Sequence, residues 1–98
     1  MIRHLAMFTI VDEKKAQKDA LLAEAAEKLA PLVGVVPGLR SIEVHSDELG
    51  EGNYDFVIIA TMDDIEAVKV YATHPEHVKA AAFIGTFRDQ RAVVDYEY

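Results

Sequence analysis

Hydrophobic and polar positions along the chain predict four strands and two helical segments. Compact apolar runs over 3–11 and 54–62 predict strands, and so do the half-exposed alternation over 39–46 and the closing segment 86–98. A helix is predicted over 14–33, because its apolar residues are three or four apart, at Leu22, Ala25, Ala26, Leu29, Leu32 and Val33. A shorter helix is expected to follow Asp63, with an apolar face of Ile65, Val68 and Ala72.

Capping residues and prolines set the expected helix ends. Asp12 is the expected N-cap of the first helix, and Asp63 with Glu66 is the expected capping pair of the second. Pro75 disfavours helical backbone at His74, so the second helix is predicted to be kinked, to break there and to restart at Pro75. The buried side of the restarted helix is expected at Val78, Ala81 and Ala82.

The predicted order of elements is β-α-β-β-α-β over one domain, 1–98. With right-handed crossovers this order gives an α+β, ferredoxin-like fold, in which two helices cover one face of an antiparallel four-stranded sheet. The first and third strands are then central, in keeping with their being the two most apolar runs.

The central strands are apolar on both faces. In the first strand, Ala6, Phe8 and Ile10 lie on one face, and Leu5, Met7 and Val11 lie on the other. An antiparallel sheet with one wet face should instead alternate apolar and polar residues. Because the helices cover one face only, we expect a homodimer through the sheet faces, and assembly beyond the dimer stays open. The alternative is a monomer that tolerates an exposed apolar patch.

Composition excludes several classes of function. The net charge of −7 and the lack of a basic stripe argue against nucleic acid as a partner. The absence of cysteine excludes disulfides, thiolate catalysis and cysteine zinc sites. No apolar run is long enough to span a membrane, which is consistent with a cytoplasmic protein.

The segment 71–77, YATHPEH, contains the candidate chemistry. His77 is the leading candidate, because a histidine with an ordinary pKa can remove an acidic proton at neutral pH; the alternative is a first-turn histidine that caps the helix or packs. Tyr71 lies one step off the apolar stripe, so that its hydroxyl can reach a cavity and hold an enolate; the alternative is a core tyrosine. His74 is expected mainly as an N-cap and hinge, and His4 begins a central strand.

A metal or cofactor site is not predicted. His74 and His77 are three residues apart and His45 or Glu76 could join them, but this spacing is a weak ligand signature. No phosphate-binding glycine-rich loop or nucleophile elbow is present. The sequence therefore predicts no metal, no cofactor, no phosphoryl transfer and no serine hydrolysis.

Four segments together resemble the stress-responsive A/B barrel (Dabb) family: RHLAMFTI, VPGL, YDFVIIATMDDIEAVKVYATHPEHV and VVDYEY. The resemblance implies a dimeric α+β barrel in which two sheets pack face to face. From a plant polyketide cyclase in this family it also implies that His77 is a general base and that Tyr71 orients a substrate oxygen. His4 and His74 match further family histidines, which implies a substrate-binding role for both.

Two functions follow as hypotheses. The first is a stress-linked homodimer that binds a small hydrophobic ligand between helices and sheet without turning it over. The second is a small-molecule enzyme of the polyketide-cyclase or cofactor-free oxygenase type. The segment after His77, VKAAAF, leaves room for a ligand and specifies none.

Overall fold

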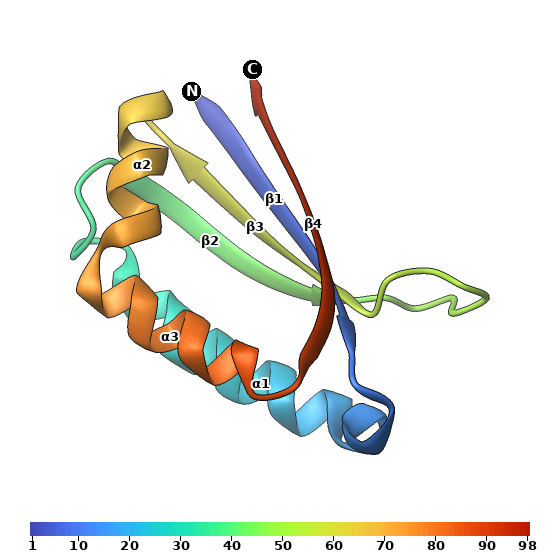
Figure 1. The fold of residues 1–98 in the computed structure, drawn as a ribbon. Helices are drawn as coiled ribbons and strands as arrows, with labels where there is room; N and C mark the ends of the chain where they lie inside the picture. Colours follow the sequence, from blue (N-terminus) through green and yellow to red (C-terminus); the bar gives the residue numbers. More distant parts are fainter.

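Helices cover one face of a four-stranded sheet, and the other face is open (Figure 1). The computed structural model describes residues 1–98. The elements are β1 (Ile2–Ile10), the 3₁₀ helix η1 (Asp12–Gln17), α1 (Lys18–Leu29), the 3₁₀ helix η2 (Ala30–Leu32), β2 (Leu39–Ser46), β3 (Phe56–Met62), α2 (Ile65–Thr73), α3 (Pro75–Gly85) and β4 (Arg88–Glu97). None of the helices has the length and apolar character needed to cross a membrane.

The sheet has the predicted ferredoxin-like topology. Its strand order is β2-β3-β1-β4, and all three pairings are antiparallel. The first and third strands, β1 and β3, are central, as their apolar character predicted. Strand ends differ from the predicted ranges by no more than two residues.

The prediction of one continuous helix over 14–33 is wrong. The chain forms η1, α1 and η2 in succession, and Asp12 lies inside η1 instead of capping α1. Because η1 buries none of its side chains, packing does not impose α-helical geometry on it. At the other end Pro31 lies in η2, after which Val33 is exposed and Val36 is buried in its place.

The second helical segment breaks at His74 and restarts at Pro75, as predicted, and the break is complete enough to give two separate helices instead of a single kinked one. Helix α2 ends at Thr73, His74 is extended at φ −64° and ψ 131°, and α3 begins at Pro75. The expected cap at Asp63 is wrong by one residue, since Asp64 accepts the hydrogen bond from the Ala67 amide at 2.9 Å. Asp63 instead pairs with Arg40.

The predicted buried faces of α2 and α3 are also displaced. Ile65 and Val78 are about half exposed, at 47% and 51%, while Val68 is partly buried. Ala72 and Ala81 face a cavity, and Ala82 is exposed. A helix of two or three turns fits neighbouring apolar stripes almost equally well, so periodicity alone did not fix its rotation. The buried positions are Ala67, Tyr71, Ala80 and Ile84.

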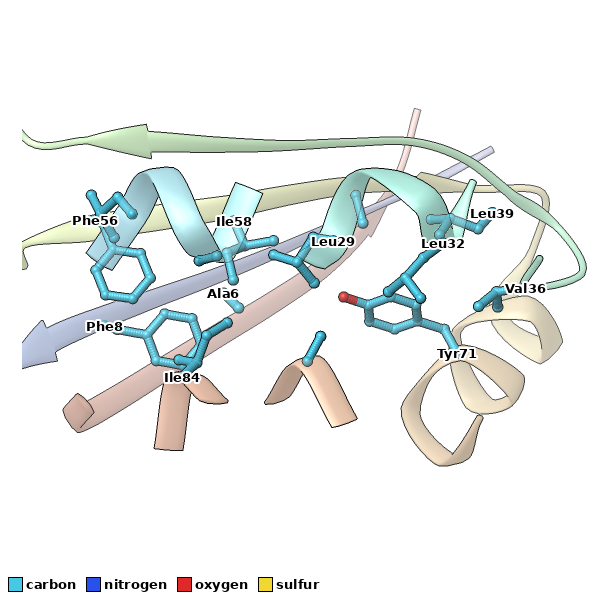
Figure 2. Close-up of a cluster of buried hydrophobic side chains, with 14 of the residues drawn as sticks. Ala6, Phe8, Leu29, Leu32, Val36, Leu39, Phe56, Ile58, Tyr71 and Ile84 are labelled. Atoms are coloured by element: carbon cyan, nitrogen blue, oxygen red, sulfur yellow. The ribbon is translucent and has the colours of Figure 1, made fainter. Parts of the chain in front are cut away.

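The two faces of the sheet differ in cover, as predicted. On the helix face, alternate residues of β1 and β3 are buried with residues from the helices in one core (Figure 2). On the other face no helix covers the partly exposed side chains of β1 and β3 or Val94 of β4, which is 53% exposed. We call this second face the open face; its apolar members are Leu5, Met7, Val57, Ile59 and Val94.

Candidate functional site

A cavity of about 290 Å³ lies between the helix layer and strands β1 and β4. Its wall is mainly apolar, with contributions from Ala6, Phe8, Leu29, Ile58 and Ile84. Five polar side chains join them: His4, Tyr71, His77, Arg88 and Arg91. The size and the few polar groups in an apolar wall are typical of a small-molecule site.

The break between α2 and α3 brings Tyr71 and His77 together. Their ring centroids are 3.9 Å apart and the planes are inclined by 38°. Tyr71 comes from the last turns of α2, and His77 is the third residue of α3, so the extended backbone at His74 sets their contact. Nδ1 of His77 is buried and has no hydrogen-bond partner. A buried ring nitrogen without a partner is uncommon, and a catalytic role is one of the explanations for it.

The pKa of His77 is lowered from its usual value of 6.5. Burial is the main cause, because it disfavours the charged imidazolium. Hydrogen bonding to the Ala72 backbone opposes this effect, and the proximity of His4, Arg91 and His74 adds to it. His77 is therefore a neutral imidazole at neutral pH, which is the form that can accept a proton.

The pKa of Tyr71 shifts in the opposite direction. Burial raises the pKa of its phenol to about 12, against a weaker lowering by the charge of Arg91. The hydroxyl points away from α2 toward Leu29 and forms no hydrogen bond to the protein (Figure 2). Tyr71 is therefore protonated at neutral pH and has a free O–H to donate to a ligand.

His4 is held by a carboxylate on the neighbouring strand. The β1–β4 register places it opposite Asp95, and its Nδ1 donates to Asp95 Oδ1 at 2.6 Å. This bond leaves Nε2 as the free ring nitrogen and fixes the orientation of the ring. The ring of His4 also meets Tyr71 edge-on, with centroids 5.8 Å apart. His4, Tyr71 and His77 thus form one continuous group.

The fourth predicted site residue lies apart from this group. His74 is not among the cavity-lining residues; it is the N-cap of α3, where its Nδ1 accepts a hydrogen bond from the Glu76 amide at 3.1 Å. The N-cap role agrees with the interpretation from Pro75. His45 lies near Glu43 on β2, and the structure has no group of three His, Asp or Glu side chains placed to hold a metal ion.

Sequence reasoning did not name three residues of the site: Asp95, Arg88 and Arg91. Asp95 lies within the VVDYEY segment, but its role depends on strand register, which pairs residues 91 positions apart. Arg88 and Arg91 lie in a segment for which the sequence predicted only a strand. That both side chains line one cavity is visible only in the structure.

Known protein families and solved structures that resemble this chain agree with this architecture. The family model described as the stress responsive A/B barrel domain, abbreviated Dabb, matches residues 2–98. The chain belongs to the Dabb family. The segments that suggested the resemblance thus extend to a match over nearly the whole sequence.

Relatives of this Dabb chain include one with a named activity. An uncharacterised protein of Streptomyces coelicolor is 32% identical over 99 residues and covers 100% of both chains. The olivetolic acid cyclase of Cannabis sativa is 24% identical over 99 residues, covering 97% of this chain and 94% of that protein.

A solved structure from Bacteroides fragilis shares the ferredoxin-like fold of this Dabb chain. It is described as a dimeric protein of unknown function, is 28% identical, and covers 99% of this chain and 95% of its own. The TM-score is 0.88.

Proposed function

We propose that this protein is a homodimer in which each protomer binds a small, largely apolar carbonyl compound in the cavity and removes a proton from it. The observation that carries this proposal is the neutral imidazole of His77, which has an unpaired buried nitrogen and is packed against Tyr71 inside an apolar cavity. Removal of a proton next to a carbonyl is the kind of step with which polyketide-cyclase or cofactor-free oxygenase chemistry can begin. The similarity to a protein named olivetolic acid cyclase supports this type of activity.

The proposed reaction starts at a carbon next to one or two carbonyl groups. His77 accepts the proton from that carbon, and the electron pair of the broken C–H bond moves to the carbonyl oxygen as an enolate. The enolate carbon then takes a proton or attacks a second carbonyl carbon, and the imidazolium returns its proton to the product. No oxidant, metal or cofactor is needed for this balance.

The other polar groups have distinct tasks in this proposal. Tyr71 donates its hydroxyl to the enolate oxygen, and its pKa of about 12 keeps it a donor instead of a competing base. Asp95 holds His4 in one orientation beside Tyr71, so that this ring lines the cavity as a positioned polar group. His74 remains a helix cap in this assignment.

The homodimer is proposed through the open face. The apolar side chains of this face are partly exposed, and burying the exposed remainder of each contributes a fraction of the about 1.5–3 kcal/mol that full burial of such a side chain is worth. The described dimer of the similar Bacteroides fragilis protein supports the same oligomeric state. Since the cavity lies on the helix face, pairing through the open face leaves it accessible to ligand.

Deuterium exchange tests the proton-transfer proposal. The methylene protons of ethyl acetoacetate in D₂O are followed by NMR with the protein or with an equal concentration of free imidazole. We expect the protein to exchange them faster than imidazole, and His77→Asn to reduce the excess rate by about 10²-fold or more. Tyr71→Phe, which removes only the hydroxyl, should reduce it about tenfold or more.

The neighbouring histidine provides a matched control. His74→Asn removes an imidazole three residues away and keeps an N-capping side chain, so it should leave both exchange and folding unchanged. Equal exchange by protein and free imidazole would overturn the proposal and leave a dimer that binds ligands without turning them over. A full rate in His77→Asn would overturn the assignment of the base.

A further inference from the structure

Two positive charges without partners line the cavity. Of the ten Lys and Arg side chains, all but Lys14, Arg88 and Arg91 contact a carboxylate, a carbonyl oxygen or an aromatic ring. Two of these three exceptions line the same cavity, and no Asp or Glu lines it with them. Both arginines are exposed, so water can solvate them, but their convergence on one cavity in a protein with a net charge of −7 makes this cavity a place that favours an anion.

An irregularity in β4 places both arginines on the helix face. Residues three apart on a regular strand point to opposite faces of a sheet. Here Arg91 pairs with Phe8 and Arg88 pairs with Ile10, so β4 advances three residues while β1 advances two. The extra residue is a β-bulge, and bulges next to functional sites commonly redirect a side chain. The Gln90 amide donates to Thr9 Oγ1 at 2.8 Å within it.

Arg91 is near the proposed base and proton donor. The charge of Arg91 acts on both Tyr71 and His77, lowering the pKa of each. It therefore lies close enough to favour negative charge at that end of the cavity. A ligand held by Arg91 would extend its uncharged part along the apolar wall toward the two rings.

We infer that the ligand of this cavity is a small organic carboxylate, held at its carboxylate by Arg88 and Arg91. Guanidinium groups bind carboxylates through paired, charge-assisted hydrogen bonds and remain charged at any usable pH. The inference rests on the proposed function for the identity of the cavity as the site, and it replaces a purely apolar ligand by one with an anionic end. The same charges also favour the enolate, the second negative charge of the reaction.

A matched pair of ligands tests this inference. Binding of 3-phenylpropanoate and of its neutral amide, 3-phenylpropanamide, is followed by NMR shifts of backbone amides. We expect the carboxylate to bind about tenfold or more tightly than the amide, with shifts in β4 and near His77. Arg91→Gln should remove most of that preference and Arg88→Gln part of it, whereas Arg91→Lys should retain part.

The control is an arginine at the opposite edge of the sheet. Arg40→Gln makes the same change of charge on β2, outside the cavity, and should leave the preference unchanged. Equal binding of acid and amide by the wild-type protein would overturn the inference. So would a preference that persists in the Arg88→Gln, Arg91→Gln double variant, provided its NMR spectrum shows the native fold.

The two proposals fail separately. His77→Asn should retain the carboxylate preference, because the arginines and not the base create it. A carboxylate preference without deuterium exchange would contradict the proton-transfer proposal alone. Exchange of neutral ethyl acetoacetate without a carboxylate preference would contradict the anionic ligand alone.

Discussion

At the scale of single residues, burial shifts the pKa values of His77 and Tyr71 in opposite directions, although the two rings are in contact. Burial lowers the pKa of the imidazole and raises that of the phenol, because in both cases it disfavours the charged form. The result is a neutral acceptor beside a neutral donor over the physiological pH range. An acid–base pair of this kind arises mainly from desolvation and needs no ion pair between its members.

The lowered pKa of His77 predicts a specific dependence of stability on pH. Below pH 6.5 the unfolded chain protonates this histidine before the folded protein does, so the free energy of unfolding decreases as the pH falls. The loss ends once the pH is below the folded pKa, where both states are protonated. Urea unfolding of the wild type and of His77→Asn between about pH 5 and pH 8 measures this contribution by difference.

As the pH falls, the wild type should lose more of its free energy of unfolding than His77→Asn does. A constant difference across the pH series would show that other groups cause any acid sensitivity. Since the asparagine side chain of the His77→Asn variant does not titrate, the pH profile of this variant is the baseline for the remaining groups.

The sequence predicted those site residues whose roles depend on their immediate neighbours, and it missed those whose roles depend on distant parts of the chain. The cap at His74 follows from Pro75 alone, and it was predicted correctly. The partnership of His4 with Asp95 depends on strand register, and the cavity position of Arg88 and Arg91 depends on a bulge. Neither register nor bulge has a signal within a few residues of the side chains concerned.

At the scale of elements, the turn after the first helical segment fixes where α2 packs. Gly38 has φ +81°, and its carbonyl accepts a hydrogen bond from the Asp63 amide at 3.0 Å. A Cβ at this position would lie 2.6 Å from Cβ of Ala67, one of the two buried residues of α2. The close approach of turn and helix therefore depends on glycine in two ways, by conformation and by space.

Two glycine substitutions separate these effects. Gly34 has φ +93° with nothing near its missing Cβ, so Gly34→Ala should cost about 1 kcal/mol of unfolding free energy from backbone strain alone. Gly38→Ala adds the collision with Ala67 and should cost roughly 2–4 kcal/mol. Urea unfolding measures both variants.

A double variant is the control for these two substitutions. Adding Ala67→Gly to Gly38→Ala removes Cβ of Ala67, the atom with which the new methyl group collides. It should recover part of the lost free energy of unfolding, despite the lower helix propensity of glycine. Equal effects of the two single substitutions would contradict the proposed packing of α2 on the turn.

The type of each element was predictable, but the rotation of the short helices was not. The central positions of strands β1 and β3 followed from the ferredoxin-like order of elements, and their strong apolar runs agree with it. The faces of α2 and α3 were displaced because nine and eleven residues are too few for periodicity to choose among adjacent stripes. The start of the first helix was also misplaced. Asp12 was assigned as its N-cap from local sequence alone, without the tertiary contacts that decide where an α-helix begins.

At the scale of the whole molecule, the open face is the largest uncovered apolar feature on the sheet. Helices cover only the other side (Figure 1), and the open face combines residues from both central strands with Val94 of β4. In the proposed dimer, face-to-face pairing of two sheets would bury these side chains in a second core. The protomer would then have two cores, one internal and one shared.

A single charge on the open face should separate the protomers. Val57→Asp places a carboxylate on this face, where dimerisation would bury it without a partner. Analytical ultracentrifugation at micromolar concentration should give a dimer for the wild type and the 10.9 kDa protomer for the variant.

The same substitution elsewhere is the control. Val78→Asp changes an exposed residue of α3 that is not on the open face, and it should remain dimeric. A folded wild-type protomer at 10.9 kDa under these conditions would contradict pairing through this face.

The bulge in β4 would give the proposed chemistry and the proposed selectivity to different parts of the chain. The proposed proton-transfer residues His77 and Tyr71 come from the helices, whereas Arg88 and Arg91, proposed to meet the charged end of the ligand, are two positions on one strand. On this proposal, substitutions at those two positions would exchange one class of compound for another while the reaction stays the same. A scaffold of this kind could acquire new substrates through changes in an edge strand, without disturbing the helices that carry the proposed base and proton donor.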